Sequence, residues 1–290
     1  MGLKNFSIVL DSPTGAFYAG TVVSGRVLLS LDKPKTIRAL NVKIEGVAKV
    51  SFRDEERVTK SDGDSKTVMV DFTAEEEYFS TKFKLAGRGT GETEIPIGEY
   101  SYPFSYTLPP LLPSSFEGEY GSIRYSVKAV IDRPWKFDHE TKTSFIVVAP
   151  LDLNYNANAK DPVKIEDEKN FCCFCCTSGP LQLVVSLPHS GYVAGQSIPL
   201  TIEVDNASNV EVDKIICKLK KEMKWIANNP RRNEKRQKDE LVKLSLEGVR
   251  CNGSKSWTQQ LTVPSDMPFV NFEPCSIIGI DFSLKVSSIF

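Results

Sequence analysis

Residues 18–27, Tyr-Ala-Gly-Thr-Val-Val-Ser-Gly-Arg-Val, have a counterpart at residues 192–200, Tyr-Val-Ala-Gly-Gln-Ser-Ile-Pro-Leu. Both segments begin with an aromatic residue, pass through a small residue and a glycine, and enter an apolar run typical of a strand, although their registers differ by one residue. Two further pairs follow in the same order: residues 37–44 with 212–219, and residues 122–128 with 279–285. One such pair can arise by chance between strands, whereas three pairs in one order indicate an internal repeat.

Short apolar or alternating runs recur between glycine and proline turns. In residues 123–129 every second side chain is apolar, which is the period of a strand with one buried face. Further strands are predicted at residues 6–10, 22–31, 40–50, 68–72, 78–85, 100–108 and 143–148. Residues 233–244 are rich in charge and lack an apolar stripe, so we predict a loop in their first half. The pattern predicts an all-β protein with two tandem immunoglobulin-like β-sandwiches.

The length of 290 residues suits two domains of ordinary size. The repeat predicts a first domain at residues 1–150, a linker with a cysteine cluster at residues 151–178, and a second domain at residues 179–290. The first domain continues after its 122–128 strand to a final strand, whereas the second ends at Phe290, so we expect it to be incomplete at its C-terminus. An open sandwich edge leaves backbone groups unpaired, which suggests that the natural chain continues.

A string of motifs in the first half is more specific than the strands around it. It comprises Pro-Phe at 103–104, Leu-Pro at 108–109, Pro-Ser-Ser-Phe-Glu-Gly at 113–118, Tyr-Gly-Ser-Ile-Arg-Tyr at 120–125 and Arg-Pro-Trp at 133–135. This string resembles the arrestin domain-containing proteins, or α-arrestins. Residues 178–181, 191–196 and 275–278 are similar to the second domain of the same family. The resemblance covers nearly the whole chain and implies the arrestin fold in both halves.

The resemblance also implies a function, that of a non-enzymatic adaptor that binds cytoplasmic tails of membrane receptors and transporters for endocytic sorting. Members of the family reach WW-domain ubiquitin ligases through Pro-Pro-x-Tyr motifs in a tail after the second domain. Here the Pro109-Pro110 pair is followed by Leu111 and Leu112, so we expect a link to ubiquitination only through a tail that these 290 residues do not include. A structural component of an endosomal sorting coat, similar to the arrestin-fold subunit of retromer, is the alternative.

Residues 214–238, the basic segment, contain ten basic residues against Glu222 and Glu234. This excess suits anionic phospholipid headgroups or an acidic or phosphorylated cargo tail, and a solvated strand face with a loop is the structural alternative. The predicted contacts are Lys218, Lys220, Lys221, Lys224, Arg231, Arg232, Lys235 and Arg236. Nucleic acid is not expected as a partner, because stacking aromatics are few here and the whole chain carries a net charge of -1.

Four of the seven cysteines, Cys172, Cys173, Cys175 and Cys176, lie in one short run. A zinc ion needs four tetrahedral ligands, which so short a run hardly supplies, and a thioredoxin-type motif needs a following helix. S-acylation near a membrane and a reduced, partly buried linker therefore remain as the two interpretations. The other three cysteines, Cys217, Cys251 and Cys275, are predicted to be core or strand residues.

No catalytic residue, metal site or cofactor is predicted. The two histidines, His139 and His189, each lie near a turn without a cluster of metal ligands. Residues 87–91 are glycine-rich but match neither phosphate-binding fingerprint. The acidic runs at residues 54–56 and 75–77 are interpreted as solvated strand ends beside a long loop, residues 57–67. Since neither a signal peptide nor an apolar span is evident, we expect a cytoplasmic protein, peripheral to the plasma membrane and endosomes.

Overall fold

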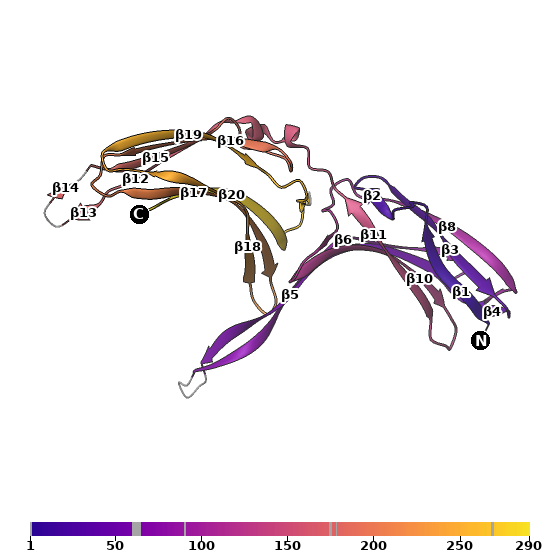
Figure 1. The fold of residues 1–290 in the computed structure, drawn as a ribbon. Coiled ribbons are helices and arrows are strands. Elements are labelled where there is room, and N and C mark those ends of the chain that lie inside the picture. Colours follow the sequence, from indigo (N-terminus) through magenta and orange to yellow (C-terminus); the bar gives the residue numbers. More distant parts are fainter. Residues whose placement is uncertain (1, 60–64, 90, 174–175, 178, 268–269) are drawn as a thin grey trace. The chain divides into compact units, whose positions relative to one another are not determined.

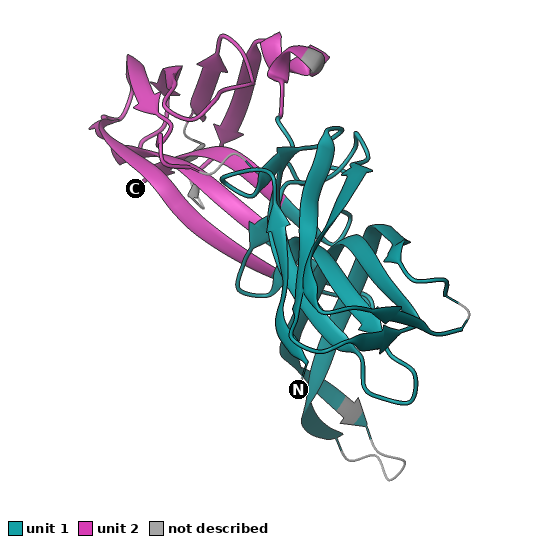
Figure 2. Ribbon diagram, turned by 90° about the vertical axis from the view of Figure 1, so that its right-hand side faces the viewer, with its two compact units in different colours: residues 1–150, 224–235, 270–279 teal, residues 151–223, 236–269, 280–290 magenta. Residues whose placement is uncertain are grey.

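The computed structural model describes residues 2–59, 65–89, 91–173, 176–177, 179–267 and 270–290. They form two compact units, coloured separately in Figure 2. Unit 1 comprises residues 1–150, 224–235 and 270–279, and unit 2 comprises residues 151–223, 236–269 and 280–290. Strands dominate both units, and the helical turns found in the described ranges are the short 3-10 segments η1 (Leu153–Tyr155) and η2 (Ala157–Lys160). The prediction of an all-β protein is confirmed.

The strands of unit 1 form two large sheets and a small one (Figure 1). The strands in residues 1–150 are β1 (Leu3–Leu10), β2 (Ala16–Tyr18), β3 (Val22–Leu31), β4 (Lys35–Ile37), β5 (Ala39–Thr59), β6 (Ser65–Ala86), β7 (Thr93–Ile95), β8 (Gly98–Thr107), β9 (Phe116–Glu117), β10 (Gly121–Asp132) and β11 (His139–Val148). One large sheet has the order β1-β3-β8, and the other has the order β2-β11-β10-β5-β6 with β9 beside β10. β4 and β7 pair separately.

The core of unit 1 lies between the two large sheets and is centred on Tyr125 of β10. The alternation predicted at residues 123–129 is confirmed, because the apolar side chains at the odd positions of this stretch are all buried. Phe79 of β6 stacks on Tyr106 of β8 with ring centroids 5.3 Å apart, and on Tyr125 at 6.0 Å. Gly46 of β5 leaves room for these rings, since a Cβ there would lie 2.5 Å from Tyr125 and 2.8 Å from Phe79. A larger residue at position 46 would displace the aromatic core.

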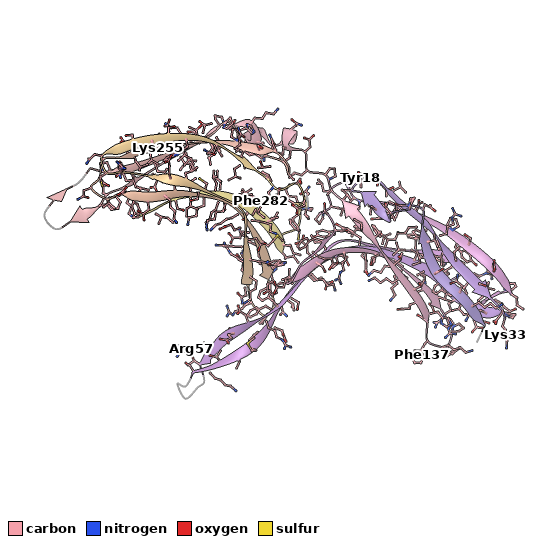
Figure 3. The ribbon with its side chains drawn as sticks, viewed as in Figure 1. Tyr18, Lys33, Arg57, Phe137, Lys255 and Phe282 are labelled. Carbon is pink, nitrogen blue, oxygen red and sulfur yellow. The ribbon has the colours of Figure 1, made fainter. Side chains whose placement is uncertain are left out.

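The hairpin of β5 and β6 is longer than the sequence pattern suggested. β6 joins the two predicted strands at residues 68–72 and 78–85 into one, and its pairing with β5 continues to Thr59 opposite Ser65. The predicted loop at residues 57–67 is therefore wrong where it covers residues 57–59 and 65–67. Arg57 lies near the outer end of this hairpin (Figure 3). The ion pair of Arg53 with Asp71 is one cross-strand contact that supports the extension.

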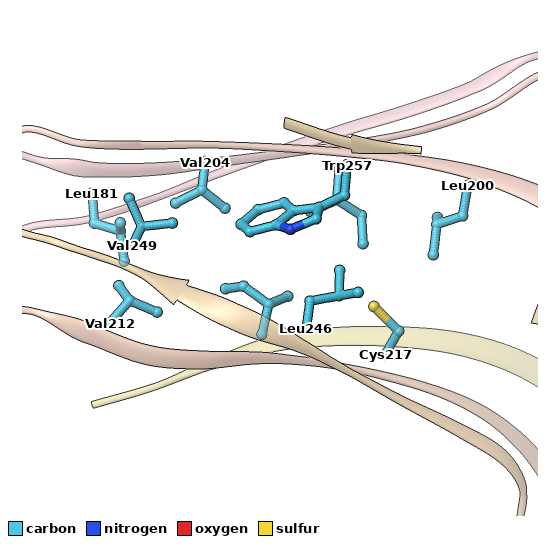
Figure 4. Close-up of a cluster of buried hydrophobic side chains, with 10 residues drawn as sticks. Leu181, Leu200, Val204, Val212, Cys217, Leu246, Val249 and Trp257 are labelled. Carbon is cyan, nitrogen blue, oxygen red and sulfur yellow. The ribbon is translucent and has the colours of Figure 1, made fainter. Parts of the chain in front are cut away.

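Unit 2 is built on the strands β12 (Val163–Lys169), β13 (Cys172–Cys173), β14 (Cys176–Thr177), β15 (Leu181–Leu187), β16 (Ser197–Asn206), β17 (Val212–Ala227), β18 (Asn233–Val249), β19 (Gly253–Thr262) and β20 (Ile278–Ile289). Their sheets have the orders β12-β15-β16-β19 and β18-β17-β20, and β13 pairs with β14. The ends of β17, β18 and β20 that fall in residues 224–235 and 278–279 belong to unit 1. Figure 4 shows the core of unit 2, in which Trp257 of β19 lies among apolar side chains from both larger sheets.

Two predictions about the second half need correction. Residues 233–244 are strand throughout, since β18 begins at Asn233, and the loop predicted for their first half is wrong. Residues 163–169, predicted to be part of the linker, form β12, which pairs along its whole length with β15. In both segments the charged side chains hide the strand signal, because an exposed strand face needs no apolar residues.

Candidate functional site

The basic segment covers most of β17 and the first residues of β18, and the two strands pair in one sheet. Along β17 the residues at odd positions from 217 to 227 are buried, with Lys221 as the half-buried exception. The even positions carry Lys218, Lys220, Glu222 and Lys224, which are half-buried side chains on the other face of the strand. A period of two thus places most of the lysines of β17 on one face.

In unit 2 that face is an array of mixed charge. Lys218 pairs with Glu240 at 2.6 Å, and Arg236 pairs with Glu222 at 3.1 Å. Lys221, on the inner face, pairs with Asp239 at 3.0 Å. The hydrogen bond from each lysine lowers the pKa of its carboxylate partner, that of Glu240 and that of Asp239. These contacts hold β17 and β18 together by cross-strand charge pairing.

The part of the basic segment that belongs to unit 1, residues 224–235, contacts the acidic run of β5. The Lys235 ammonium lies 3.0 Å from Asp54, and the Arg231 guanidinium lies 2.9 Å from Glu56. Asn233 also donates to Asp54, at 3.2 Å, and the hydrogen bonds from Lys235 and Asn233 lower the pKa of that carboxyl. The interpretation of this acidic run as solvated strand ends is therefore wrong for Asp54 and Glu56.

Aromatic rings lie beneath these ion pairs. Phe52 and Phe72 face each other across β5 and β6 with centroids 5.7 Å apart, and Arg231 and Lys235 lie over Phe72 and Phe52 at 5.6 Å and 5.8 Å. The cations thus contribute attraction to the ring faces as well as charge pairing.

Backbone hydrogen bonds and a ring contact also join residues 224–235 to the rest of unit 1. Thr73 of β6 forms an antiparallel bridge with Asn229, with N–H···O distances of 2.8 and 3.0 Å. The indole of Trp225 is buried against Tyr120, with centroids 5.2 Å apart. Residues 224–235 are accordingly an integral part of unit 1.

The eight predicted contact residues therefore differ in the partners that they have in the structure. Arg231 and Lys235 pair with acidic residues of unit 1, and Lys218, Lys221 and Arg236 pair with acidic residues of unit 2. Lys224 also has an interaction of its own. Lys220 and Arg232 have no ion pair within 4.0 Å among the described residues, and Arg232 is exposed. Opposite runs of charge were visible in the sequence and could have suggested this pairing. That the segment binds lipid or cargo stays a prediction.

The cysteine cluster is described only in part. Cys172 and Cys173 belong to β13 and Cys176 to β14, with Cys173 opposite Cys176, whereas Cys175 lies outside the described residues. Acylation and an inert linker both stay predictions. Of the other cysteines, Cys217 is buried as predicted, while Cys251 is exposed at the turn between β18 and β19, so its assignment to core or strand is wrong.

The described ranges contain no group of three or more His, Cys, Asp and Glu residues placed to hold a metal ion. His139 of β11 instead contacts Lys35, with the imidazole Nε2 3.1 Å from the ammonium. Burial and the nearby cations lower the pKa of His139. Within the same ranges no helix has the length and apolarity that a membrane crossing requires.

Comparison with known proteins agrees with this two-unit, all-β architecture. Residues 6–154 match the family described as arrestin (or S-antigen), N-terminal domain, and residues 177–290 match arrestin (or S-antigen), C-terminal domain. The chain belongs to the arrestin family, and its tandem β-sandwich fold and the resemblance to arrestin domain-containing proteins are confirmed.

Its curated relatives carry the same family name. Arrestin domain-containing protein 17 of Caenorhabditis elegans is 28% identical over 98% of this chain and 67% of its own length. Arrestin domain-containing protein 1 of Mus musculus is 29% identical over 97% of this chain and 60% of its own length. Arrestin domain-containing protein 4 of Homo sapiens is 30% identical over 98% and 67%. The chain therefore spans between 60% and 67% of the length of these relatives.

Proposed function

We propose that this chain is a non-enzymatic adaptor that binds cytoplasmic regions of membrane receptors or transporters for endocytic sorting. The observation that supports it most is the match of both arrestin domains, in order, over nearly all of the chain. In this proposal the protein works at the cytoplasmic face of the plasma membrane and of endosomes. A link to WW-domain ubiquitin ligases would run through Pro-Pro-x-Tyr motifs in further sequence, since Pro109-Pro110 continues into leucines.

Within the basic segment, Arg232 of unit 1 is the residue that best suits an acidic or phosphorylated cargo tail. Its charge is not matched by an ion pair among the described residues, whereas Arg231 and Lys235 pair with Glu56 and Asp54. An exposed guanidinium can bind a phosphate or carboxylate through two parallel hydrogen bonds.

Binding to purified tail peptides tests the cargo contact. Arg232→Gln should weaken binding of an acidic or phosphorylated peptide about tenfold, and the difference should shrink at high salt. Lys82→Gln, an exposed lysine on β6, serves as the matched control and should leave binding unchanged. Equal affinity of Arg232→Gln and the wild type would contradict the role given to Arg232.

Proximity labelling in cells tests the adaptor function itself. Fused to a labelling enzyme, the chain should mark membrane proteins with cytoplasmic regions, and a purified cytoplasmic region of a marked protein should bind it directly. Labelling confined to soluble proteins would overturn the proposal. Recovery of a stable complex of fixed stoichiometry, independent of cargo, would favour a sorting-coat subunit instead.

A further inference from the structure

Two aromatic side chains project almost completely into solvent from the turn between β10 and β11, residues 133–138. Trp135 is 96% exposed and Phe137 is 94% exposed, the highest values among the large apolar side chains of the described residues. Figure 3 labels Phe137 at this end of the β10–β11 hairpin. Rings of this size normally bury most of their surface, so an aromatic pair held out in water indicates a contact surface.

The turn is built to hold its aromatic residues outward. Trp135 has a φ of 56°, an unusual conformation for a residue with a bulky side chain. Arg133 fixes the base of the turn, because its guanidinium Nε donates to the Phe137 carbonyl at 2.8 Å and its backbone N–H donates to Asp138 at 3.1 Å. Arg38 donates to the Arg133 carbonyl from outside, at 3.0 Å. The rings therefore project from an ordered turn.

The surroundings of the two rings are cationic. Lys136 lies between the two rings in the sequence. Burial lowers the pKa of Lys35, and the nearby charges of Arg133 and Lys136 lower it further. The acidic side chains at this end are engaged locally: Asp132 pairs with Arg38 at 3.0 Å, and Asp138 accepts the Arg133 N–H. The basic groups outnumber the acidic ones around the exposed rings.

Exposed aromatic rings beside basic side chains are the composition of a segment that lies in the headgroup region of an anionic bilayer. Tryptophan is enriched at that depth, where its ring is half in hydrocarbon and its N–H reaches water. Basic side chains at the same level attract acidic lipid headgroups. A protein partner would need a pocket for two rings on a narrow turn and an acidic rim around it, whereas a bilayer needs neither.

We propose that residues 133–138 form a membrane contact that inserts Trp135 and Phe137 into an anionic bilayer surface, with Arg133, Lys136 and Lys35 beside the lipid phosphates. One such turn provides only weak, reversible attachment, which suits a peripheral protein. The contact is independent of the basic segment and of the cargo role proposed above.

The protein carries its own reporter for this contact. Of its three tryptophans, Trp225 and Trp257 are 1% and 9% exposed, so a change of emission on membrane binding comes from Trp135. Vesicles of phosphatidylcholine with phosphatidylserine should shift the emission to the blue, brominated lipids should quench it, and vesicles of phosphatidylcholine alone should do much less. No shift with the anionic vesicles would overturn the proposal.

Variants separate insertion from loss of folding. Phe137→Ala and Trp135→Ala should each lower co-sedimentation with the anionic vesicles about tenfold and leave the thermal unfolding temperature unchanged, since both side chains are already in water. Tyr18→Ala, which removes an aromatic ring 60% exposed on β2, is the matched control and should bind like the wild type. Undiminished sedimentation of both turn variants, or self-association without vesicles that Phe137→Ala abolishes, would contradict a membrane contact.

Discussion

Tyr125 shows how one residue combines packing and hydrogen bonding in unit 1. Its ring is buried against Phe79 and Phe145, and its hydroxyl donates to the Pro113 carbonyl at 2.6 Å. Pro113 belongs to the motif string that also contains Tyr125, so the hydrogen bond joins two parts of that string across the core. Burial raises the pKa of the phenol well above its ordinary value, which keeps it a donor.

We predict that Tyr125→Phe destabilises unit 1 by about 1–3 kcal/mol, because it leaves the buried Pro113 carbonyl without its donor. Chemical denaturation followed by circular dichroism measures the change. Tyr100→Phe is the matched control, since Tyr100 also donates to a proline carbonyl, that of Pro96, but in an exposed setting. A loss as large in the control as in Tyr125→Phe would contradict this account.

Glu45 of β5 predicts a dependence of stability on pH. Hydrogen bonds from Lys43 first, and from Lys142 as well, lower its pKa in the folded state in spite of partial burial. A carboxyl with a lowered folded pKa contributes stability above its unfolded pKa, about 4.3, and that contribution is lost as the pH falls through the folded value. Denaturation midpoints should therefore drop less steeply between about pH 6 and pH 3 in Glu45→Gln than in the wild type.

Glu99→Gln, at an exposed position of β8, is the control for that experiment and should keep the slope of the wild type. Parallel curves for the wild type and Glu45→Gln would show that the Lys43 and Lys142 contacts do not stabilise the folded state.

At the scale of elements, the segment of residues 224–235 determines how unit 1 is completed. Trp225 lies against Gly121, where an added Cβ would be 3.1 Å from the indole and 2.6 Å from the Lys49 carbonyl. The neighbouring Phe52, Phe72 and Tyr120 complete the aromatic cluster. Unit 1 is thus assembled from distant parts of the chain.

We predict that Trp225→Ala costs about 3–5 kcal/mol and loosens β5 and β6 around Phe52 and Phe72, because it leaves a large cavity beside Tyr120, which packs on Phe52. Hydrogen exchange followed by mass spectrometry locates the effect. Trp257→Ala, which removes the central ring of the unit 2 core, should instead raise exchange in β16 and β19. Unchanged protection of β5 and β6 in Trp225→Ala would contradict the assignment of residues 224–235 to unit 1.

At the scale of the whole molecule, the labelling rates of the cysteine thiols measure how accessible their surroundings are to solvent. Cys217 lies in the unit 2 core, where burial raises its pKa to about 11, and Cys251 lies exposed at a turn. Since the thiolate is the reactive form, maleimide labelling of the native protein should modify Cys251 rapidly and Cys217 only after denaturation. Peptide mapping distinguishes the sites, and equal rates at both would mean that the core opens readily.

Much of this molecule was predictable from local patterns. Alternation along residues 123–129, the repeated Tyr-to-Gly entry into a strand and the motif string from Pro103 to Trp135 were enough to predict an all-β tandem fold and its family. Charge-rich strands were harder, as β18 and the outer part of β5 and β6 show. Their stability comes from cross-strand partners, so composition alone suggested loops.

The sequence by itself determined the fold class, because the alternation of buried and exposed side chains along a strand appears as alternating apolar and polar residues at adjacent positions. Only the tertiary structure decided that the basic segment is largely paired, that Arg231 and Lys235 meet Glu56 and Asp54, and that Trp135 and Phe137 stand in water. The physical reason is the range of the interactions. A side chain's neighbours in the sequence determine its strand, whereas its charge partners and its exposure depend on residues that folding brings from far along the chain.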